Sequence, residues 1–198
     1  MAQKSLNYCR AVVIVHGKSE LLIFSYIKRS LHITIEQFSK NNGNNSIQIT
    51  SLMNVLNSNI FLKENLLNFY NIETDGDNLI NFKLFTIMDT DDCTETQKET
   101  YINKEMFKGH WLCEYIAPIY NINNLEDVIK KVGLISKEIK SSNKVNTYIK
   151  IFPQTNAKEV TVDNVAEIKK YADIFRKEKN TNLEELFDYC LKCVQPKQ

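Results

Sequence analysis

The sequence has no long apolar run and no strong excess of charge of either sign. No segment approaches the ~20 apolar residues that a helix needs to cross a membrane, and residues 1–10 contain no apolar stretch of signal-peptide length. Lysine and arginine total 25 and aspartate and glutamate total 24, which gives a net charge of +1. The first two absences predict a cytoplasmic protein without a membrane partner. The balanced charge neither requires nor excludes a nucleic-acid partner.

Cysteine is scarce, odd in number and irregularly spaced. The five cysteines are Cys9, Cys93, Cys113, Cys190 and Cys193. Free thiols in a reducing compartment are the simplest interpretation. The last two form a CxxC pair, but a structural zinc site needs four ligands and the sequence contains no second pair. We therefore interpret this spacing as a coincidence on a helix.

Hydrophobic residues make up 43% of the chain, which is enough for a packed core. Apolar and β-branched runs predict strands at residues 12–15, 32–39, 82–88 and 114–120, and a further strand or extended segment at 147–152. Helical spacing of apolar residues predicts helices at 20–31, 47–57, 61–70, 94–107, 125–132, 162–177 and 183–193. This order predicts an α/β fold with a mostly parallel four-stranded sheet and helices on both faces.

Polar clusters follow two of the apolar runs at the point where each strand should end. Residues 11–15 lead into His-Gly-Lys-Ser-Glu at 16–20, and residues 82–88 lead into Asp-Thr-Asp-Asp at 89–92. Ligands of open α/β sheets bind at the carboxyl ends of the strands, so both clusters are expected at one edge. Carboxylates that converge there repel one another unless a cation lies between them. Hard oxygen ligands of this kind suit Mg²⁺ or Mn²⁺.

Two other interpretations of the first cluster fail on the sequence. Residues 17–19 match the end of a phosphate-binding P-loop, but Val12 stands where that loop needs its first glycine. The segment Val15-His16-Gly17 is similar to an oxyanion loop of α/β-hydrolases, but the sequence contains no G-x-S-x-G nucleophile elbow.

Together the two clusters resemble the signatures of the Toprim domain, a strand ending in Glu-Gly-x-x-Asp/Glu and a later strand ending in Asp-x-Asp. Within that family the chain is most similar to the small RloB-like and overcoming-lysogenisation-defect-like nucleases of phage defence. The resemblance implies a Rossmann-like, Toprim-like domain at residues 10–135. A mostly helical C-terminal extension at residues 136–198 is expected to pack on the same domain.

The resemblance also implies a divalent-metal site that hydrolyses phosphodiester bonds of DNA or RNA. Asp89 and Asp91 match the Asp-x-Asp pair, and the two-residue repeat of a strand would point both carboxylates to the same side. Glu20 matches the acidic position at the start of the first helix. Asp92 is a further candidate ligand, and Glu126 lies where related nucleases often have another acidic residue.

His16 occupies the position at which the family has glutamate. A neutral imidazole binds Mn²⁺, Fe²⁺ or Zn²⁺ better than Mg²⁺, and it can also act as a general acid or base near neutral pH. The candidate catalytic set is therefore His16, Glu20, Asp89 and Asp91, with Lys18 as the candidate phosphate-binding residue at a helix N-terminus. The alternative is a Toprim-like module that binds nucleic acid or a partner without cutting.

The same residues also have an interpretation without chemistry. The acidic run at 89–92 would favour the N-terminal dipole of a following helix, and Glu20 would be a capping-box residue. Lys18 would be an ordinary solvated lysine. The chain would then be a Rossmann-like interaction protein.

The C-terminal third carries scattered lysines of the kind that contact phosphates, with acidic residues between them. They are Lys130, Lys131, Lys137, Lys140, Lys144, Lys150 and Lys158. The sequence contains no recognised DNA- or RNA-reading motif. DNA or RNA as the partner and the oligomeric state stay open, and the resemblance adds a possible ATPase partner.

Overall fold

The computed structural model describes residues 7–139, 143–154 and 159–194. Its centre is a parallel four-stranded sheet in the order β2-β1-β5-β6. The four strands are β1 (Ala11–Val15), β2 (Ile35–Phe38), β5 (Lys83–Asp89) and β6 (Ile116–Asn121). A small antiparallel hairpin of β3 (Thr74–Asp75) and β4 (Asn78–Leu79) lies outside the sheet. The predicted α/β class is therefore confirmed.

β1 is central because all of its side chains are apolar. It pairs in parallel with β2 on one side and β5 on the other, so that Val15 lies opposite Ile87. All five β1 residues are fully buried. Val12 and Ile14 contact one hydrophobic cluster, whereas Val13 and Val15 contact the other. A strand that is covered on both faces needs this continuous apolar run.

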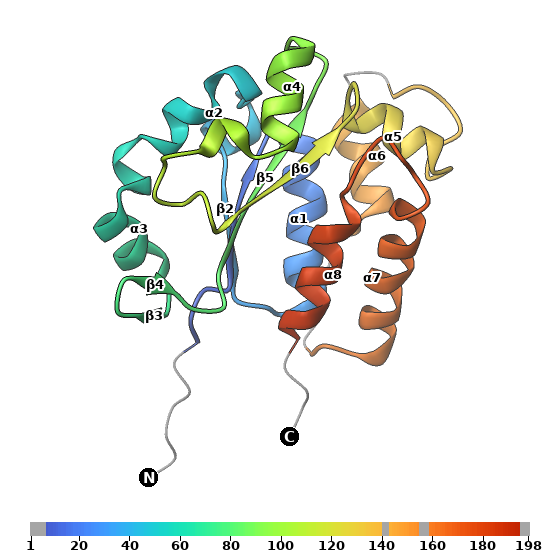
Figure 1. The fold of residues 1–198 in the computed structure, drawn as a ribbon. Coiled ribbons are helices and arrows are strands. Elements are labelled where there is room, and N and C mark those ends of the chain that lie inside the picture. The colour runs from blue at the N-terminus through green and yellow to red at the C-terminus, as the bar shows by residue number, and fades with distance from the viewer. Residues whose placement is uncertain (1–6, 140–142, 155–158, 195–198) are drawn as a thin grey trace.

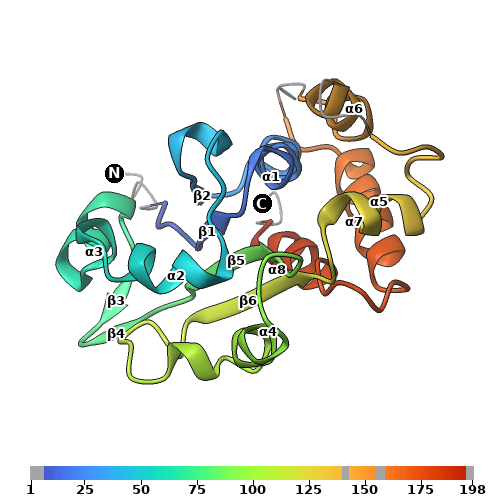
Figure 2. The ribbon, with the colours of Figure 1, turned by 90° about the horizontal axis from the view of Figure 1, so that it is seen from above.

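Helices cover both faces of the sheet (Figures 1 and 2). One face carries α1 (Lys18–Leu31), α5 (Leu125–Lys131), α6 (Lys144–Ile151), α7 (Val162–Phe175) and α8 (Glu184–Cys193). The other face carries α2 (Ile49–Leu56), α3 (Lys63–Tyr70) and α4 (Glu95–Ile102). Short 3-10 turns are η1 (Asn41–Gly43), η2 (Asn59–Phe61) and η3 (Glu105–Phe107).

The prediction of a strand or extended segment at residues 147–152 is wrong, because residues 147–151 lie in helix α6 and Phe152 is its C-cap. Tyr148 and Phe152 are four residues apart, and both side chains are fully buried. The Phe152 ring lies 5.7 Å from the ring of Tyr26 on α1, between centroids. Ile149 is 39% exposed. The short run of branched residues favours a strand locally, but burial at a four-residue spacing selects the helix.

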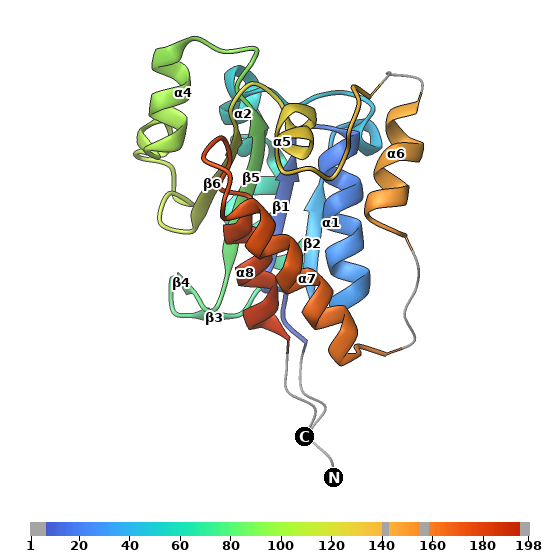
Figure 3. The same ribbon diagram turned by 90° about the vertical axis from the view of Figure 1, so that its right-hand side faces the viewer.

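The C-terminal helices share one core with the predicted Toprim-like segment. Ala172 of α7 and Phe187 of α8 belong to the same buried cluster as Phe24 and Ile27 of α1. Figure 3 shows α1, α6, α7 and α8 side by side on this face of the sheet. Residues 140–142, 155–158 and 195–198 lie outside the described part of the chain, and with them Lys140 and Lys158.

Within the described ranges, no helix has both the length and the apolar character that crossing a membrane requires. All five cysteines, which fall inside these ranges, are free thiols. Residues 1–6, where part of the signal-peptide prediction falls, lie outside the described residues.

Candidate functional site

The first polar cluster forms the turn between β1 and α1. Gly17 is the N-cap of α1, with extended backbone angles (φ −157°, ψ −158°). The carboxylate of Glu20 lies back over the helix start and accepts a hydrogen bond from the Gly17 N–H at 2.9 Å. Glu20 is only 3% exposed. The carboxylate therefore makes the contact expected of a capping-box residue. It is also buried, however, which a capping role alone does not require.

The second cluster begins on the neighbouring strand, and Asp89 is the last residue of β5. Its Oδ1 accepts hydrogen bonds from the Asn121 side-chain amide (3.0 Å) and from the backbone N–H of Leu125 (3.1 Å). Its Oδ2 lies 4.0 Å from Nε2 of His16. The two motifs therefore meet at the carboxyl edge of the sheet.

Asp91 and Asp92 lie beyond the end of β5. Side chains alternate only while the chain is a strand, and the strand ends at Asp89. Asp91 is exposed in the following turn, whereas Asp89 is buried. Asp92 is half-buried, and its Oδ1 is a buried atom without a hydrogen-bond partner. Within the described residues, no hydrogen bond links Asp91 to Asp89 or Glu20.

Glu126, in the first turn of α5, is held by side chains from two other helices. Its Oε1 accepts hydrogen bonds from Ser19 Oγ and from Tyr148 Oη, both at 3.1 Å. The ammonium group of Lys144 lies 2.7 Å from the same oxygen. Helix α6 therefore brings a cation to the site. The lysine scatter of the C-terminal third was the one sequence signal for Lys144, and no motif distinguished it from the other lysines.

Lys18 lies beside the site but points to a neighbouring turn. Its Nζ is 3.4 Å from the carbonyl oxygen of Asn42 in η1. That turn has left-handed backbone angles at Asn41, Asn42 and Gly43, with φ of 49°, 51° and 79°. A Cβ on Gly43 would lie 3.1 Å from Cα of Lys18. The η1 turn therefore fits closely over the start of α1.

Burial dominates the electrostatics of the two central carboxyls. It raises the pKa of Glu20 to about 7, and the charge of Glu126 adds to this effect while Lys144 opposes it. Burial raises the pKa of Asp89 to about 8, with the charge of Glu20 as the next cause and His16 in opposition. The site therefore favours either bound protons or an added cation.

The donor chemistry of the site fits a divalent cation. Nδ1 of His16 and Oδ1 of Asp92 are buried atoms without hydrogen-bond partners. Carboxylates suit Mg²⁺ or Mn²⁺, and an imidazole beside them favours Mn²⁺ over Mg²⁺. Glu20 and Asp89 would hold the ion, with His16 beside them. Among the residues that the structure describes, however, no three His, Cys, Asp or Glu side chains already form a group that could hold a metal. The ligand set is chemically suitable but is not closed in this arrangement.

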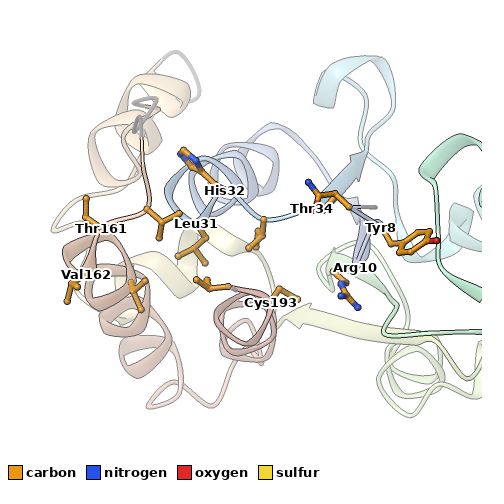
Figure 4. A pocket seen from close by; sticks show the side chains of 13 residues that line it. Tyr8, Arg10, Leu31, His32, Thr34, Thr161, Val162 and Cys193 are labelled. Atoms are coloured by element: carbon orange, nitrogen blue, oxygen red, sulfur yellow. The ribbon is translucent and has the colours of Figure 1, made fainter. Parts of the chain in front are cut away.

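A cavity of about 550 Å³ lies at the opposite end of the sheet, near the end of α1 and the start of α7. Figure 4 shows Leu31, Thr161, Val162 and Cys193 around it, with Arg10 at one side. None of the candidate site residues lines this cavity. The cavity is therefore separate from the carboxylate site.

Fold and site together define a Rossmann-like α/β protein with two buried carboxylates at the carboxyl edge of its parallel sheet, Asp89 at the end of β5 and Glu20 at the start of α1. No protein-family model, no curated protein and no solved structure matches the chain.

Proposed function

We propose that this protein is a Toprim-like nuclease that hydrolyses phosphodiester bonds of DNA or RNA with the aid of Mg²⁺ or Mn²⁺, and that it acts in phage defence. One observation carries the proposal. Glu20, in the first turn of α1 after β1, and Asp89, the last residue of β5, are buried carboxylates with pKa values raised by burial and by neighbouring negative charge. Keeping two acids buried in this way costs stability, and such a cost is typical of functional sites.

The protein's own residues have distinct tasks under this proposal. Asn121 and the Leu125 N–H orient Asp89 by holding its Oδ1, so that Oδ2 faces His16. His16 moves a proton at the attacking water or the leaving oxygen. Lys18 leaves the Asn42 carbonyl to bind a phosphate oxygen. A bound cation would supply positive charge to the phosphoryl oxygens and lower the pKa of a water.

A second candidate function is a non-catalytic Toprim-like module that binds nucleic acid or a partner such as an ATPase. The hydrogen bonds that the carboxylates already accept favour this second function. Glu20, Asp89 and Glu126 each already accept hydrogen bonds from the protein, and no three-ligand group is formed among the described residues. The absence of glutamate at position 16 points the same way.

Calorimetric titration of the metal-stripped chain with Mn²⁺ and Mg²⁺ tests the metal site. We expect saturable binding by the wild type that is lost in Asp89→Asn and kept in Asp77→Asn, an exposed aspartate paired with Lys63. No binding at millimolar metal, alone or with nucleic acid added, would contradict the proposal. A nuclease screen on DNA and RNA then separates the two candidates, and an unchanged cleavage rate in His16→Ala would remove the catalytic role of His16.

We also propose that the protein acts in the cytoplasm. Five free thiols, including the buried Cys9 and Cys190, agree with a reducing compartment.

A further inference from the structure

A chain of buried hydrogen bonds connects Asp89 to the segment that precedes α8. Asn121 is fully buried at the end of β6, and its amide NH₂ donates to Oδ1 of Asp89 at 3.0 Å. The amide oxygen of Asn121 accepts a hydrogen bond from the hydroxyl of Thr181 at 2.9 Å. Thr181 is 4% exposed, and its oxygen accepts the backbone N–H of Leu183 at 3.1 Å. The hydrogen bonds therefore all run in one direction: Leu183 donates to Thr181, Thr181 to Asn121, and Asn121 to Asp89.

The backbone holds Thr181 in this position. Asn121 and Thr181 form an antiparallel bridge, and the N–H of Ile122 donates to the carbonyl of Asn180 at 2.7 Å. The side chain of Asn182 accepts the N–H of Tyr120 at 2.9 Å and donates to the carbonyl of Pro118 at 3.0 Å. Hydrogen bonds from the residues before and after Thr181 thus hold this segment against β6.

The hydroxyl of Thr181 helps to hold the amide of Asn121 with its NH₂ group towards Asp89. The hydroxyl accepts the Leu183 N–H and donates its own proton to the amide oxygen of Asn121. An ionised carboxylate can only accept, so the NH₂ group is the end of the amide that bonds to Asp89. Without the hydroxyl the amide oxygen loses this donor, and the Asn121 side chain is held less firmly against Asp89. Aligned hydrogen bonds of this kind also strengthen one another in a buried setting.

We propose that Thr181 is a positioning residue of the carboxylate site: through Asn121 it fixes Oδ1 of Asp89 and leaves Oδ2 free for a cation. This inference rests on the proposed function and deepens it. It makes the C-terminal extension part of the site, since Thr181 lies outside residues 10–135. Partners that orient a metal ligand typically account for about 10- to 100-fold in metal affinity.

The test compares Thr181→Val, which keeps the shape and removes the hydroxyl, with Thr181→Ser, which keeps the hydroxyl. Thr86→Val is the matched control, because Thr86 is also fully buried and loses a hydroxyl contact, with Tyr101 at 2.9 Å. We expect Mn²⁺ binding to weaken by about 10-fold or more in Thr181→Val and to stay within about 3-fold of wild type in the other two variants. Equal affinity in Thr181→Val and wild type, or no rescue by serine, would overturn the inference.

A second measurement does not depend on metal. The side-chain NH₂ signals of Asn121 in a ¹H–¹⁵N NMR spectrum should move and lose protection from exchange in Thr181→Val, but not in Thr181→Ser or Thr86→Val. If the wild type binds no Mn²⁺, the proposed function fails while these signals still decide the role of Thr181. Unchanged signals in Thr181→Val would refute that role even if metal binds. If Thr181→Val does not fold, Thr181→Ala, which also removes the hydroxyl, takes its place with the same expected direction.

Discussion

Nε2 of His16 lies 4.0 Å from Oδ2 of Asp89, although the two residues belong to different motifs of the sequence. The contact follows from strand pairing, because β1 and β5 are neighbours and Val15 lies opposite Ile87. Both side chains therefore leave their strands at the same edge. This pair is the point from which a metal or an acid–base function of the site can be tested.

The pH dependence of stability tests the raised carboxyl pKa values. In the unfolded chain these groups titrate near pH 4, whereas burial in the folded protein raises the pKa of Glu20 to about 7 and that of Asp89 to about 8. Between these values the folded state binds more protons than the unfolded state. The free energy of unfolding should therefore fall as the pH rises from about 4 to about 8.

Replacing Asp89 by asparagine should reduce this loss, because an amide oxygen can still accept from Asn121 and Leu125 but carries no charge. We expect the free energy of unfolding of the wild type to fall by on the order of 4 kcal/mol more than that of Asp89→Asn between pH 5 and pH 8.5. Urea unfolding at both pH values measures the difference, and Asp77→Asn should follow the wild type. If the free energy of unfolding changed with pH in the same way in wild type and Asp89→Asn, the raised pKa of Asp89 would be contradicted.

Lys144→Met tests whether Glu126 belongs to the cation site. The Lys144 ammonium, 2.7 Å from Glu126, already supplies the positive charge at this carboxylate. Its removal should free Glu126 and tighten Mn²⁺ binding by several-fold, while the stability cost stays near or below about 1 kcal/mol for this partly exposed pair. Calorimetry reads the affinity, and Lys150→Met on the same helix is the control. Unchanged or weaker Mn²⁺ binding in Lys144→Met would contradict a ligand role for Glu126.

Gly43→Ala tests the fit of the η1 turn over the start of α1. Gly43 and Gly109 both have left-handed angles, with φ of 79° and 84°. A Cβ at Gly43 would lie 3.1 Å from Cα of Lys18, whereas a Cβ at Gly109 meets nothing within 4 Å. In both alanine variants the left-handed backbone should lower the free energy of unfolding by about 1–2 kcal/mol. In Gly43→Ala the crowding against Lys18 should lower it by about 1–3 kcal/mol more. Chemical unfolding of the two variants measures this difference. Equal decreases in the free energy of unfolding would mean that the η1 turn moves to accommodate the added Cβ.

The resemblance to Toprim domains pointed to residues that the fold brings together only in part. His16, Glu20 and Asp89 meet at one edge, because they follow or end adjacent parallel strands. Asp91 does not join them, since the strand ends two residues earlier. Alternation along a strand predicts side-chain direction only while the strand continues, and the sequence of apolar residues did not show where the last residue of β5 lies.

The contacts around the carboxylates come from parts of the chain that no local pattern connects. Ser19 and Glu126 are 107 residues apart, and Asn121 and Thr181 are 60 apart. Hydrogen bonds between such distant polar residues depend on how helices pack on the sheet. They leave no periodic signal in the sequence, so Thr181, Tyr148 and Asn121 could not be found in advance.

The sequence by itself determined the α/β class, the parallel sheet and the edge at which the polar clusters lie, because hydrophobic periodicity and strand-ending turns are local properties. It did not determine the state of residues 147–152, where local preference favours a strand and packing of Tyr148 and Phe152 against α1 selects a helix. Only the tertiary structure decided which carboxylates are buried, and which distant polar groups hold them. Burial and long-range hydrogen bonds arise when the helices close over the sheet, and it is these that shift the pKa values of Glu20 and Asp89.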